Sequence, residues 1–191
     1  GQGHETPGER YAVRSGDSVP NGPGWLLRIV PNRYPAVAGT ATRVARTETF
    51  ENHSMFPRRP VCGEHDVVIE CPDQRTRLVE LSPTEIQQTL LAWQARMRQL
   101  IVSPLICSVA IFRNEGFSAG ASLAHCHSQI LATTEMMPLD VVLHDRAAAH
   151  RSKTGRDLVQ DLSNAERSDG IRWICETAYF DVHCPFASRM S

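Results

Sequence analysis

The chain has 191 residues, of which 41% are hydrophobic and 21% charged, and its formal net charge is -1. A chain of this length and apolar content can bury one well-packed core, with room for part of a second domain. The near-zero charge excludes an overall field that would attract nucleic acid or an anionic membrane surface. A bound phosphate would therefore have to be held by local groups.

The first third of the chain predicts three short strands. Residues 1–23 are rich in glycine, proline and charge, with one strand candidate at Tyr11–Arg14. Residues 25–30, WLLRIV, predict a largely buried strand. A long polar loop is expected from residue 39 to residue 63, and His65–Glu70 predicts the next strand.

The clearest helix begins after Ser82, which can cap it, with Pro83 in the first turn and Glu85 completing a capping box. The helix is expected to end near Val102. Apolar residues recur along it at helical spacing, which predicts that this stripe packs on a sheet as core. The stripe consists of Ile86, Leu90, Trp93, Met97 and Ile101.

Residues 105–112, LICSVAIF, form a nearly continuous apolar run that predicts a central strand, and Ser128–Thr133 predicts a second one. We expect these two strands to pair antiparallel, with the connection between them at the mouth of the pair, a natural position for an active site. Farther on, residues 139–151 and 157–167 predict helices, and residues 171–182 predict a hairpin.

The connection between those two strands contains the glycine-rich sequence NEGFSAGAS, residues 114–122. Small residues let backbone amides approach an anion, and Asn114 and Ser122 can add side-chain donors. A tight turn would use the same glycines, so this motif alone is weak evidence for a phosphate site.

The next residues, HCHSQ, alternate polar side chains. On an extended strand His125, His127 and Gln129 would share one face, with Cys126 and Ser128 on the other, where Cys126 would pack in the core. One interpretation is a solvent-facing strand. Another is a metal pair, since His-x-His can begin a metal site, although no third ligand lies nearby in the sequence.

A catalytic interpretation uses these groups most fully. A neutral imidazole can attack an electrophilic phosphorus while a glycine–serine turn holds the phosphate oxygens. Imidazole is also both a nucleophile and a leaving group near neutral pH. The hypothesis requires that one ring nitrogen of His127 be hydrogen-bonded, so that the other is free to attack.

The segment FRNEGFSAGASLAHCHSQI, residues 112–130, resembles the active-site segment of the galactose-1-phosphate uridylyltransferase family, a branch of the histidine-triad superfamily. The family's pattern runs Asn-x-Gly, Gly-x-Ser and His-x-His-x-Gln. Other histidine-triad branches usually end the pattern with histidine, so Gln129 favours a transferase over a hydrolase. The matching positions are Asn114, Gly116, Gly120, Ser122, His125, His127 and Gln129.

The resemblance extends outward to residues 29–36, to residues 65–70 and to the helix start, and it covers most of residues 1–150. It implies an α+β fold, a histidine-triad-like antiparallel sheet packed by a long helix. Residues 1–150 would form an N-terminal nucleotidyltransferase domain, and residues 151–191 the start of a second, similar and incomplete half. This incomplete second half fits three alternatives, namely a fragment, a sequence with residues missing, or a naturally short protein.

What the resemblance implies is a ping-pong nucleotidyltransferase of the UDP-glucose:hexose-1-phosphate uridylyltransferase type, acting in galactose metabolism. His127 would attack the α-phosphorus of a nucleoside-diphosphate sugar and expel sugar 1-phosphate. A second phosphate-bearing substrate would then resolve the nucleotidyl-histidine. A nucleoside-diphosphate-sugar phosphorylase, an adenylyltransferase and a non-catalytic nucleotide-binding module are the alternatives.

The resemblance also assigns roles to individual residues. Gln129 would donate a hydrogen bond to the α-phosphate, and His125 would orient His127 or its strand. Asn32 and Arg33 would lie near the nucleoside. The full set of substrate-binding residues that it implies is Asn32, Arg33, Asn114, Gly116, Gly120, Ala121, Ser122 and Gln129.

Many family members hold a structural zinc with an N-terminal CxxC, a histidine before the long helix and the first histidine of the His-x-His pair. This chain begins with residues that resemble those just after the CxxC. Gln74 stands at the position of the third ligand, and a neutral glutamine is a poor zinc ligand. Only His125 remains of that set, so we predict no metal and no other cofactor.

The 6 cysteines include no CxxC pair, which favours a reducing cytosol. No run of about 18 apolar residues could span a bilayer, and the N-terminus lacks the features of a leader. We therefore expect a cytoplasmic protein with no nucleic-acid or membrane partner. The family resemblance implies a homodimer that binds a nucleoside-diphosphate sugar and a sugar 1-phosphate.

Overall fold

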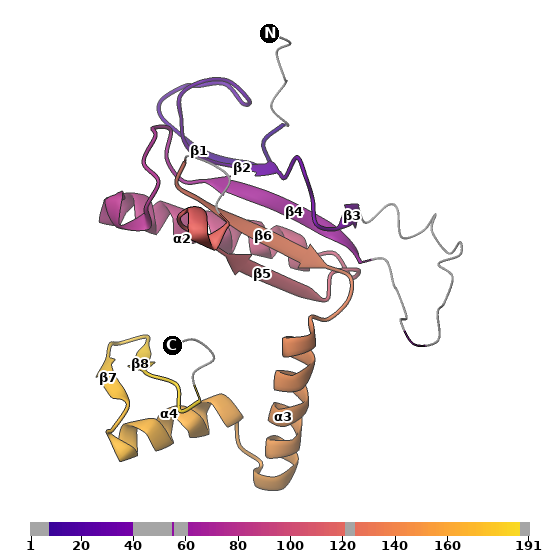
Figure 1. Ribbon diagram of the computed structural model, residues 1–191, viewed down its shortest axis with the longest axis vertical. Helices are drawn as coiled ribbons and strands as arrows, with labels where there is room; N and C mark the ends of the chain where they lie inside the picture. The colour runs from indigo at the N-terminus through magenta and orange to yellow at the C-terminus, as the bar shows by residue number, and fades with distance from the viewer. Residues whose placement is uncertain (1–7, 40–54, 56–60, 121–124, 188–191) are drawn as a thin grey trace. The chain divides into compact units, whose positions relative to one another are not determined.

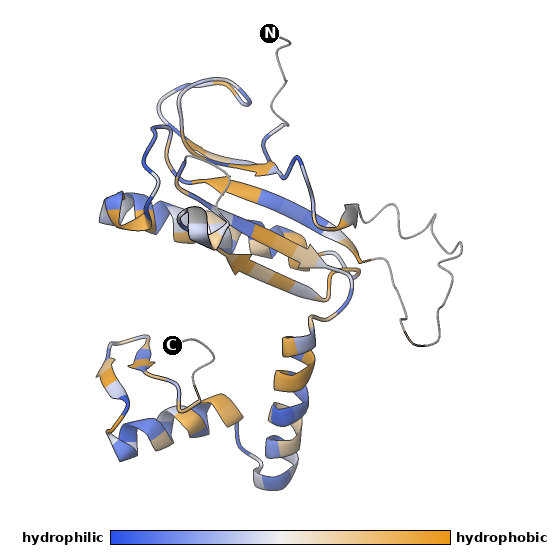
Figure 2. Ribbon diagram, in the orientation of Figure 1, coloured by the Kyte–Doolittle hydropathy of each residue, from blue (hydrophilic) through white to orange (hydrophobic). Residues whose placement is uncertain are grey.

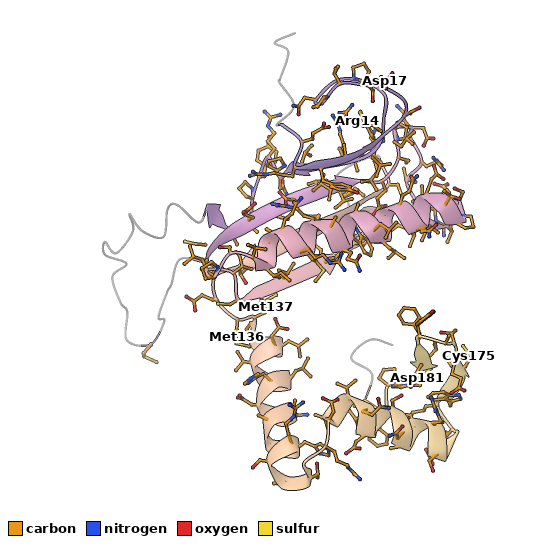
Figure 3. All side chains as sticks on the ribbon, turned by 180° about the vertical axis from the view of Figure 1, so that it is seen from behind. Arg14, Asp17, Met136, Met137, Cys175 and Asp181 are labelled. Atoms are coloured by element: carbon orange, nitrogen blue, oxygen red, sulfur yellow. The ribbon has the colours of Figure 1, made fainter. Side chains whose placement is uncertain are left out.

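The computed structural model describes residues 8–39, 55, 61–120 and 125–187. The chain divides into two compact units, residues 1–136 and 137–191, with the boundary between Met136 and Met137 (Figure 3). The boundary expected at residue 150 falls inside a helix of the second unit, α3 (Pro138–Thr154). Along the chain, the division between the units therefore falls where this helix begins.

The first unit is built on one sheet with the strand order β1, β2, β4, β6 and β5 (Figure 1). Neighbours along this order are antiparallel, and the short β3 pairs with β4 in parallel. The predicted antiparallel pairing of the two strands around the glycine-rich connection is confirmed for β5 and β6. The strands are β1 Tyr11–Arg14, β2 Trp25–Pro31, β3 Ala38–Gly39, β4 Cys62–Ile69, β5 Ser108–Phe112 and β6 His127–Thr133.

Two strands differ in extent from the prediction. β4 begins at Cys62 rather than at His65, and its first residues pair with both β3 and β6. β5 begins at Ser108 rather than at Leu105, because the backbone N–H groups of Leu105 and Ile106 donate to oxygens of Ser103 in a turn. Apolar composition alone does not separate such a turn from the strand that follows it.

The helix α2 (Pro83–Ile101) begins and ends where the sequence predicts. Ser82 is its N-cap. The Ser82 hydroxyl accepts from the Glu85 N–H at 3.3 Å, and the Glu85 carboxylate accepts from the Ser82 N–H at 2.8 Å. This capping box satisfies backbone donors that a helix start leaves unpaired. The helix packs along the sheet (Figure 1), which confirms the α+β class with an antiparallel sheet packed by a long helix.

The face of α2 that is turned to the sheet agrees with the predicted stripe only in part, since Ile86 and Trp93 pack against the buried clusters. Leu90 and Ile101 are 52% and 61% exposed, so the prediction that the whole stripe is core is wrong. The buried residues of α2 are Thr89, Ala92, Arg96 and Leu100.

Two of those buried residues are polar because each has a partner. The Thr89 hydroxyl donates to the Glu85 carbonyl at 2.9 Å, within the helix. Arg96 forms ion pairs with Asp66, at 2.7 Å, and with Glu64, and both carboxylates belong to β4. Helical periodicity counts such residues as solvent-facing, because the partners that allow their burial lie elsewhere in the sequence.

The core lies between α2 and the sheet, and its most buried residues are Leu27, Ile29, Val68, Ala92, Leu100, Ile130 and Ala132. Successive strand residues point to opposite faces. Since Ile130 of β6 faces the core, His127 and Gln129 lie on the opposite face. In β4, Val68 faces the core and His65 lies on that same opposite face. The side of the sheet away from α2 therefore carries His65, His127 and Gln129 among apolar strand residues such as Val67.

The second unit confirms the predicted helices and hairpin, as α3, α4 (Leu158–Asp169), β7 (Trp173–Glu176) and β8 (Asp181–His183). Figure 2 shows hydrophobic residues gathered in the first turns of α3, where Leu143 is 53% exposed. That this unit begins a second, similar half stays a prediction. Within the described ranges, no helix combines the length and the apolar character needed to cross a bilayer.

Candidate active site

His127 is the first residue of β6 and is 5% exposed. Its Nδ1 lies 2.8 Å from the backbone carbonyl oxygen of His125. A carbonyl oxygen can only accept a hydrogen bond, so the neutral ring carries its proton on Nδ1 and a lone pair on Nε2. This is the protonation state that a nucleophilic imidazole requires.

Gln129 lies on the same face of β6. Its Oε1 is 2.8 Å from Nε2 of His65 and 3.5 Å from Nδ2 of Asn32. Asn32 directly follows β2, and its backbone N–H donates to the His65 carbonyl at 2.7 Å. Pairing of β2, β4 and β6 thus brings together two predicted site residues, Asn32 and Gln129, that are 97 positions apart in the sequence.

The predicted shared face holds for His127 and Gln129 but not for His125, which lies in a bend before β6. The His125 Nδ1 is 2.7 Å from the carbonyl oxygen of Asp73. The next residue, Cys126, donates its backbone N–H to the Arg75 carbonyl at 2.6 Å. The loop after β4 therefore holds the backbone of His125, and the carbonyl of His125 in turn orients His127.

That loop is tied to the first turn of α2. The Arg75 guanidinium donates to both carboxylate oxygens of Glu85, at 2.6 and 2.9 Å, and to Asp73 at 2.7 Å. The hydrogen bonds from Arg75 lower the pKa of Glu85 to about 2, and they also lower the pKa of Asp73 to about 2. The charged forms of these groups hold the loop in place.

We expect acid to weaken this attachment. Because the folded-state pKa of Glu85 lies below its ordinary value of 4.5, the stability that it contributes is fully present above about pH 4.5 and is lost as the pH falls toward about 2. Glu85→Gln should therefore be less stable than the wild type at neutral pH, and the difference should disappear near pH 2.

Urea-unfolding midpoints of both proteins across this pH range test the prediction. Asp17→Asn is a matched control at an exposed position of the same unit (Figure 3), and its difference from the wild type should not follow the same pH course. A difference between Glu85→Gln and the wild type that stays constant with pH would contradict the prediction.

A buried ion pair lies beside Cys126. Arg113, the residue after β5, donates to the Glu70 carboxylate, whose side chain is 0% exposed, and to Cys126 Sγ at 2.8 Å. Burial and the hydrogen bond to Glu70 raise the pKa of the Cys126 thiol to about 12. The thiol therefore stays protonated, and the complete burial of Cys126 agrees with its predicted packing role.

In the connection between β5 and β6, Asn114 follows Arg113 and is half-buried. Gly116 (φ 83°) and Gly120 (φ 79°) adopt left-handed conformations on either side of a 3-10 turn, η2 (Phe117–Ala119). Among the described residues, a Cβ at either glycine would meet no atom within 4 Å, so the left-handed backbone conformation is what favours glycine there. Two predicted site residues, Ala121 and Ser122, lie outside the described residues.

Some predicted site residues are not joined to this network. Arg33 is exposed, and its guanidinium lies 5.5 Å from the centre of the Tyr34 ring. In the described part of the chain, no hydrogen bond joins His127 or Gln129 to the remaining predicted substrate-binding residues. These are Arg33, Asn114, Gly116 and Gly120, whose substrate roles stay predictions.

His65 belongs to the network although no motif marks it. The resemblance extends to its strand, residues 65–70, but assigns His65 no role. Its contact with Gln129 depends on the register between β4 and β6, in which Val67 stands opposite Gln129. A local pattern cannot supply that register.

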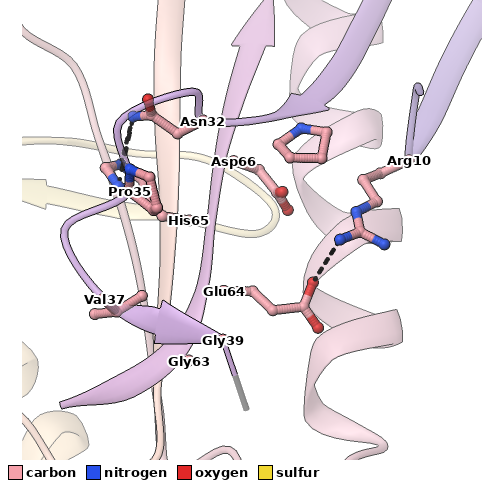
Figure 4. A pocket seen from close by; sticks show the side chains of 10 residues that line it. Arg10, Asn32, Pro35, Val37, Gly39, Gly63, Glu64, His65 and Asp66 are labelled. Carbon is pink, nitrogen blue, oxygen red and sulfur yellow. Dashed lines mark hydrogen bonds and ion pairs between the residues drawn. The ribbon is translucent and has the colours of Figure 1, made fainter. Parts of the chain in front are cut away.

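A pocket of about 420 Å³ opens at the edge of β4, beyond the end of β2 (Figure 4). Asn32 and His65 line one side of it. Glu64 lines another, where it pairs with Arg10 at 3.9 Å. His127 is not among the lining residues, so the pocket adjoins the network through Asn32 and His65.

The residues that the structure describes do not fit the family's structural zinc site. The His125 ring is hydrogen-bonded to the Asp73 carbonyl, and Gln74 is exposed. Across the described residues, no group of three or more His, Cys, Asp or Glu side chains is placed to hold a metal ion.

Residues 27–138 match the family model described as galactose-1-phosphate uridyl transferase, N-terminal domain. The chain is 31% identical over 167 residues to an ADP-glucose phosphorylase of Arabidopsis thaliana, a match that covers 87% of this chain and 45% of that protein. It is 25% identical over 167 residues to a galactose-1-phosphate uridylyltransferase of Streptomyces lividans, covering 87% of this chain and 41% of that one.

Among solved structures, the chain is similar to a galt-like protein from Arabidopsis thaliana, with a TM-score of 0.72 and 30% identity over 96% of this chain and 54% of the other. The chain thus spans about half the length of the relatives it matches. The family match covers more than half of this chain and includes His127 and Gln129. The chain belongs to the galactose-1-phosphate uridylyltransferase family.

Proposed function

We propose that the protein is a nucleotidyltransferase in which His127 carries a nucleoside monophosphate between two phosphate-bearing substrates. One observation carries the proposal. The hydrogen bond from Nδ1 to the His125 carbonyl, at 2.8 Å, leaves the Nε2 lone pair free on the sheet face that His127 shares with Gln129. Family membership supports it as well.

In the first half-reaction, Nε2 of His127 attacks the α-phosphorus of a nucleoside-diphosphate sugar. The N–P bond forms as the bond to the bridging oxygen breaks, and sugar 1-phosphate leaves with that oxygen and its electron pair. The ring becomes cationic, and the His125 carbonyl stabilises the N–H on Nδ1. In the second half-reaction, an oxygen of another phosphate attacks the phosphorus, and Nε2 leaves with its electron pair.

Gln129 would donate from its amide to an oxygen of the α-phosphate, whose charge grows during each attack. The pocket beside Asn32 fits an uncharged part of the ligand, because the charged groups of its lining are paired with one another or with Arg96, as Arg10 is with Glu64. We therefore assign that pocket to the nucleoside, in line with the role that resemblance gives to Asn32.

The first experiment asks whether the protein becomes covalently labelled. The full chain is incubated with UDP-glucose or with ADP-glucose, each labelled in the α-phosphate. We expect label on the protein that survives base and is released by acid, as a phosphoramidate is. The same sugars labelled in the β-phosphate are the control, because that phosphate leaves with the sugar. A protein that takes up no label, but is stabilised against heat by nucleotide, would be a binding module instead.

The compound that accepts the nucleoside monophosphate distinguishes a uridylyltransferase from a phosphorylase. The relative at 31% identity is an ADP-glucose phosphorylase and the relative at 25% identity is a galactose-1-phosphate uridylyltransferase. Labelled protein is therefore offered galactose 1-phosphate or inorganic phosphate. Release of label as a nucleoside-diphosphate sugar supports the uridylyltransferase type, which we propose. Release as a nucleoside diphosphate, with phosphate alone, supports the phosphorylase type.

A further inference from the structure

His65 has a defined protonation state because of its neighbours. The backbone N–H of Ala36 lies 3.0 Å from the His65 Nδ1. A backbone amide can only donate, so Nδ1 must accept, and the neutral ring then carries its proton on Nε2. That proton points at the Gln129 side chain, whose Oε1 is 2.8 Å from Nε2. The ring is 9% exposed, so little water competes for this contact.

This chain of contacts also fixes which way round the Gln129 amide lies. Its oxygen accepts from His65 Nε2 at 2.8 Å. The Asn32 Nδ2 lies 3.4 and 3.3 Å from the two ring nitrogens of His65 and 3.5 Å from Gln129 Oε1. Since Nδ1 already accepts from the shorter Ala36 contact and Nε2 then carries a proton, the Gln129 oxygen is the acceptor left for Asn32. The Asn32 amide is itself oriented, because the Tyr34 N–H donates to its Oδ1 at 2.9 Å. Turning the Gln129 amide over would set N–H against N–H at His65.

The Gln129 amide nitrogen, by contrast, has no hydrogen-bond partner among the described residues. Both of its N–H groups are therefore available to a ligand on the face shared with His127. A phosphate oxygen needs a donor there. The reversed amide would present its oxygen lone pairs to the phosphate instead, and this contact would be repulsive.

We propose that His65 is a positioning residue that holds the Gln129 amide with its NH₂ group toward the α-phosphate. The proposal rests on the nucleotidyl transfer proposed above. His65 touches no reacting atom and acts through Gln129. Because the donor is already oriented before the reaction begins, no reorientation is needed as charge develops on the phosphate. Substitution of His65 should therefore lower the rate of labelling more than it lowers the affinity for the nucleotide sugar.

The hydrogen-bond arrangement is tested without turnover. In protein with ¹⁵N- and ¹³C-labelled histidine, the ring shifts report which nitrogen carries the proton, and His65→Phe identifies the His65 signals by their loss. We expect the Nε2–H tautomer at neutral pH. An Nδ1–H tautomer would overturn the proposal, whether or not the protein transfers nucleotide.

The functional role of His65 is tested by a double-mutant cycle with Gln129, in which the rate of label uptake is measured. Gln129→Ala is expected to slow labelling by about 100-fold or more, and His65→Phe, which keeps a ring beside Phe112, by about tenfold. In the Gln129→Ala background, His65→Phe should cause no further loss, because its effect passes through the missing amide.

If His65→Phe slowed labelling by the same factor in the wild type and in Gln129→Ala, the proposal would be overturned, because a purely structural role would have this result. An unchanged rate in His65→Phe would also overturn it. His144→Phe, at an exposed histidine of α3, is the matched control and should label at the wild-type rate. If the wild type takes up no label, the nucleotidyl transfer fails, while the tautomer measurement still decides the arrangement at His65.

Discussion

His127→Asn is expected to slow the uptake of α-phosphate label by about 10⁴-fold or more, as loss of the nucleophile does in other enzymes. An asparagine amide can still donate to the His125 carbonyl, which His127 Nδ1 contacts at 2.8 Å. It places no lone pair where Nε2 stood. The variant should therefore fold and bind nucleotide, as measured by thermal stabilisation, while losing the covalent step.

The same experiment separates the two histidines of the pair. The His125 Nδ1 is also held by a backbone carbonyl, at 2.7 Å, so its Nε2 also carries a lone pair in the neutral ring. His125 lies before β6, however, and not on the face that His127 shares with Gln129. His125→Asn should slow labelling far less than His127→Asn. Label that persists in His127→Asn and disappears in His125→Asn would reverse this assignment.

Arg113→Ala is expected to lower the free energy of unfolding by about 3–5 kcal/mol, because it leaves the buried Glu70 carboxylate without its counter-charge. The Glu70 side chain is 0% exposed, and its Oε1 already has no partner among the described residues. A domain of this kind is stable by only about 5–15 kcal/mol, so the loss is a large part of the total.

Urea unfolding followed by circular dichroism measures this loss. Arg77→Ala is the matched control, since Arg77 is 63% exposed in its ion pair with Glu115 and should contribute about 0–1 kcal/mol. Arg113→Lys keeps the charge and should be destabilised less than Arg113→Ala, which gives a folded variant to measure if alanine unfolds the protein. Equal, small losses at Arg113 and Arg77 would contradict the buried-charge argument.

The elements that the sequence predicts well are those specified by neighbouring residues. The capping box of Ser82 and Glu85 lies within one helical turn and sets the start of α2. The pairing of β5 with β6 follows from two apolar runs joined by a glycine-rich connection. Alternation along a single strand is enough to place His127 and Gln129 on one face.

The features that the sequence does not predict depend on residues far apart. Arg96 lies on the buried face of α2 because Asp66, 30 positions away, is its partner. His65 meets Gln129 across 64 positions, through the register of β4 and β6. Arg113 and Glu70 pair across 43 positions. In each case a charged or polar side chain is buried where a sequence pattern predicts an apolar one. The partner that makes this burial possible is known only once the fold brings the two residues together.

The ion pairs of Arg96 have a consequence for the placement of α2 on the sheet. An apolar helix face can slide along a sheet and exchange one set of contacts for another at low cost. The Arg96 guanidinium instead reaches Asp66 and Glu64 together, two residues on one face of β4. A shift of the helix by one turn, about 5.4 Å, would separate Arg96 from Asp66 and leave two buried charges without their partners. Charge complementarity therefore gives α2 a single translational and rotational position, and through Glu85 and Arg75 it sets the position of the carbonyl that orients His127.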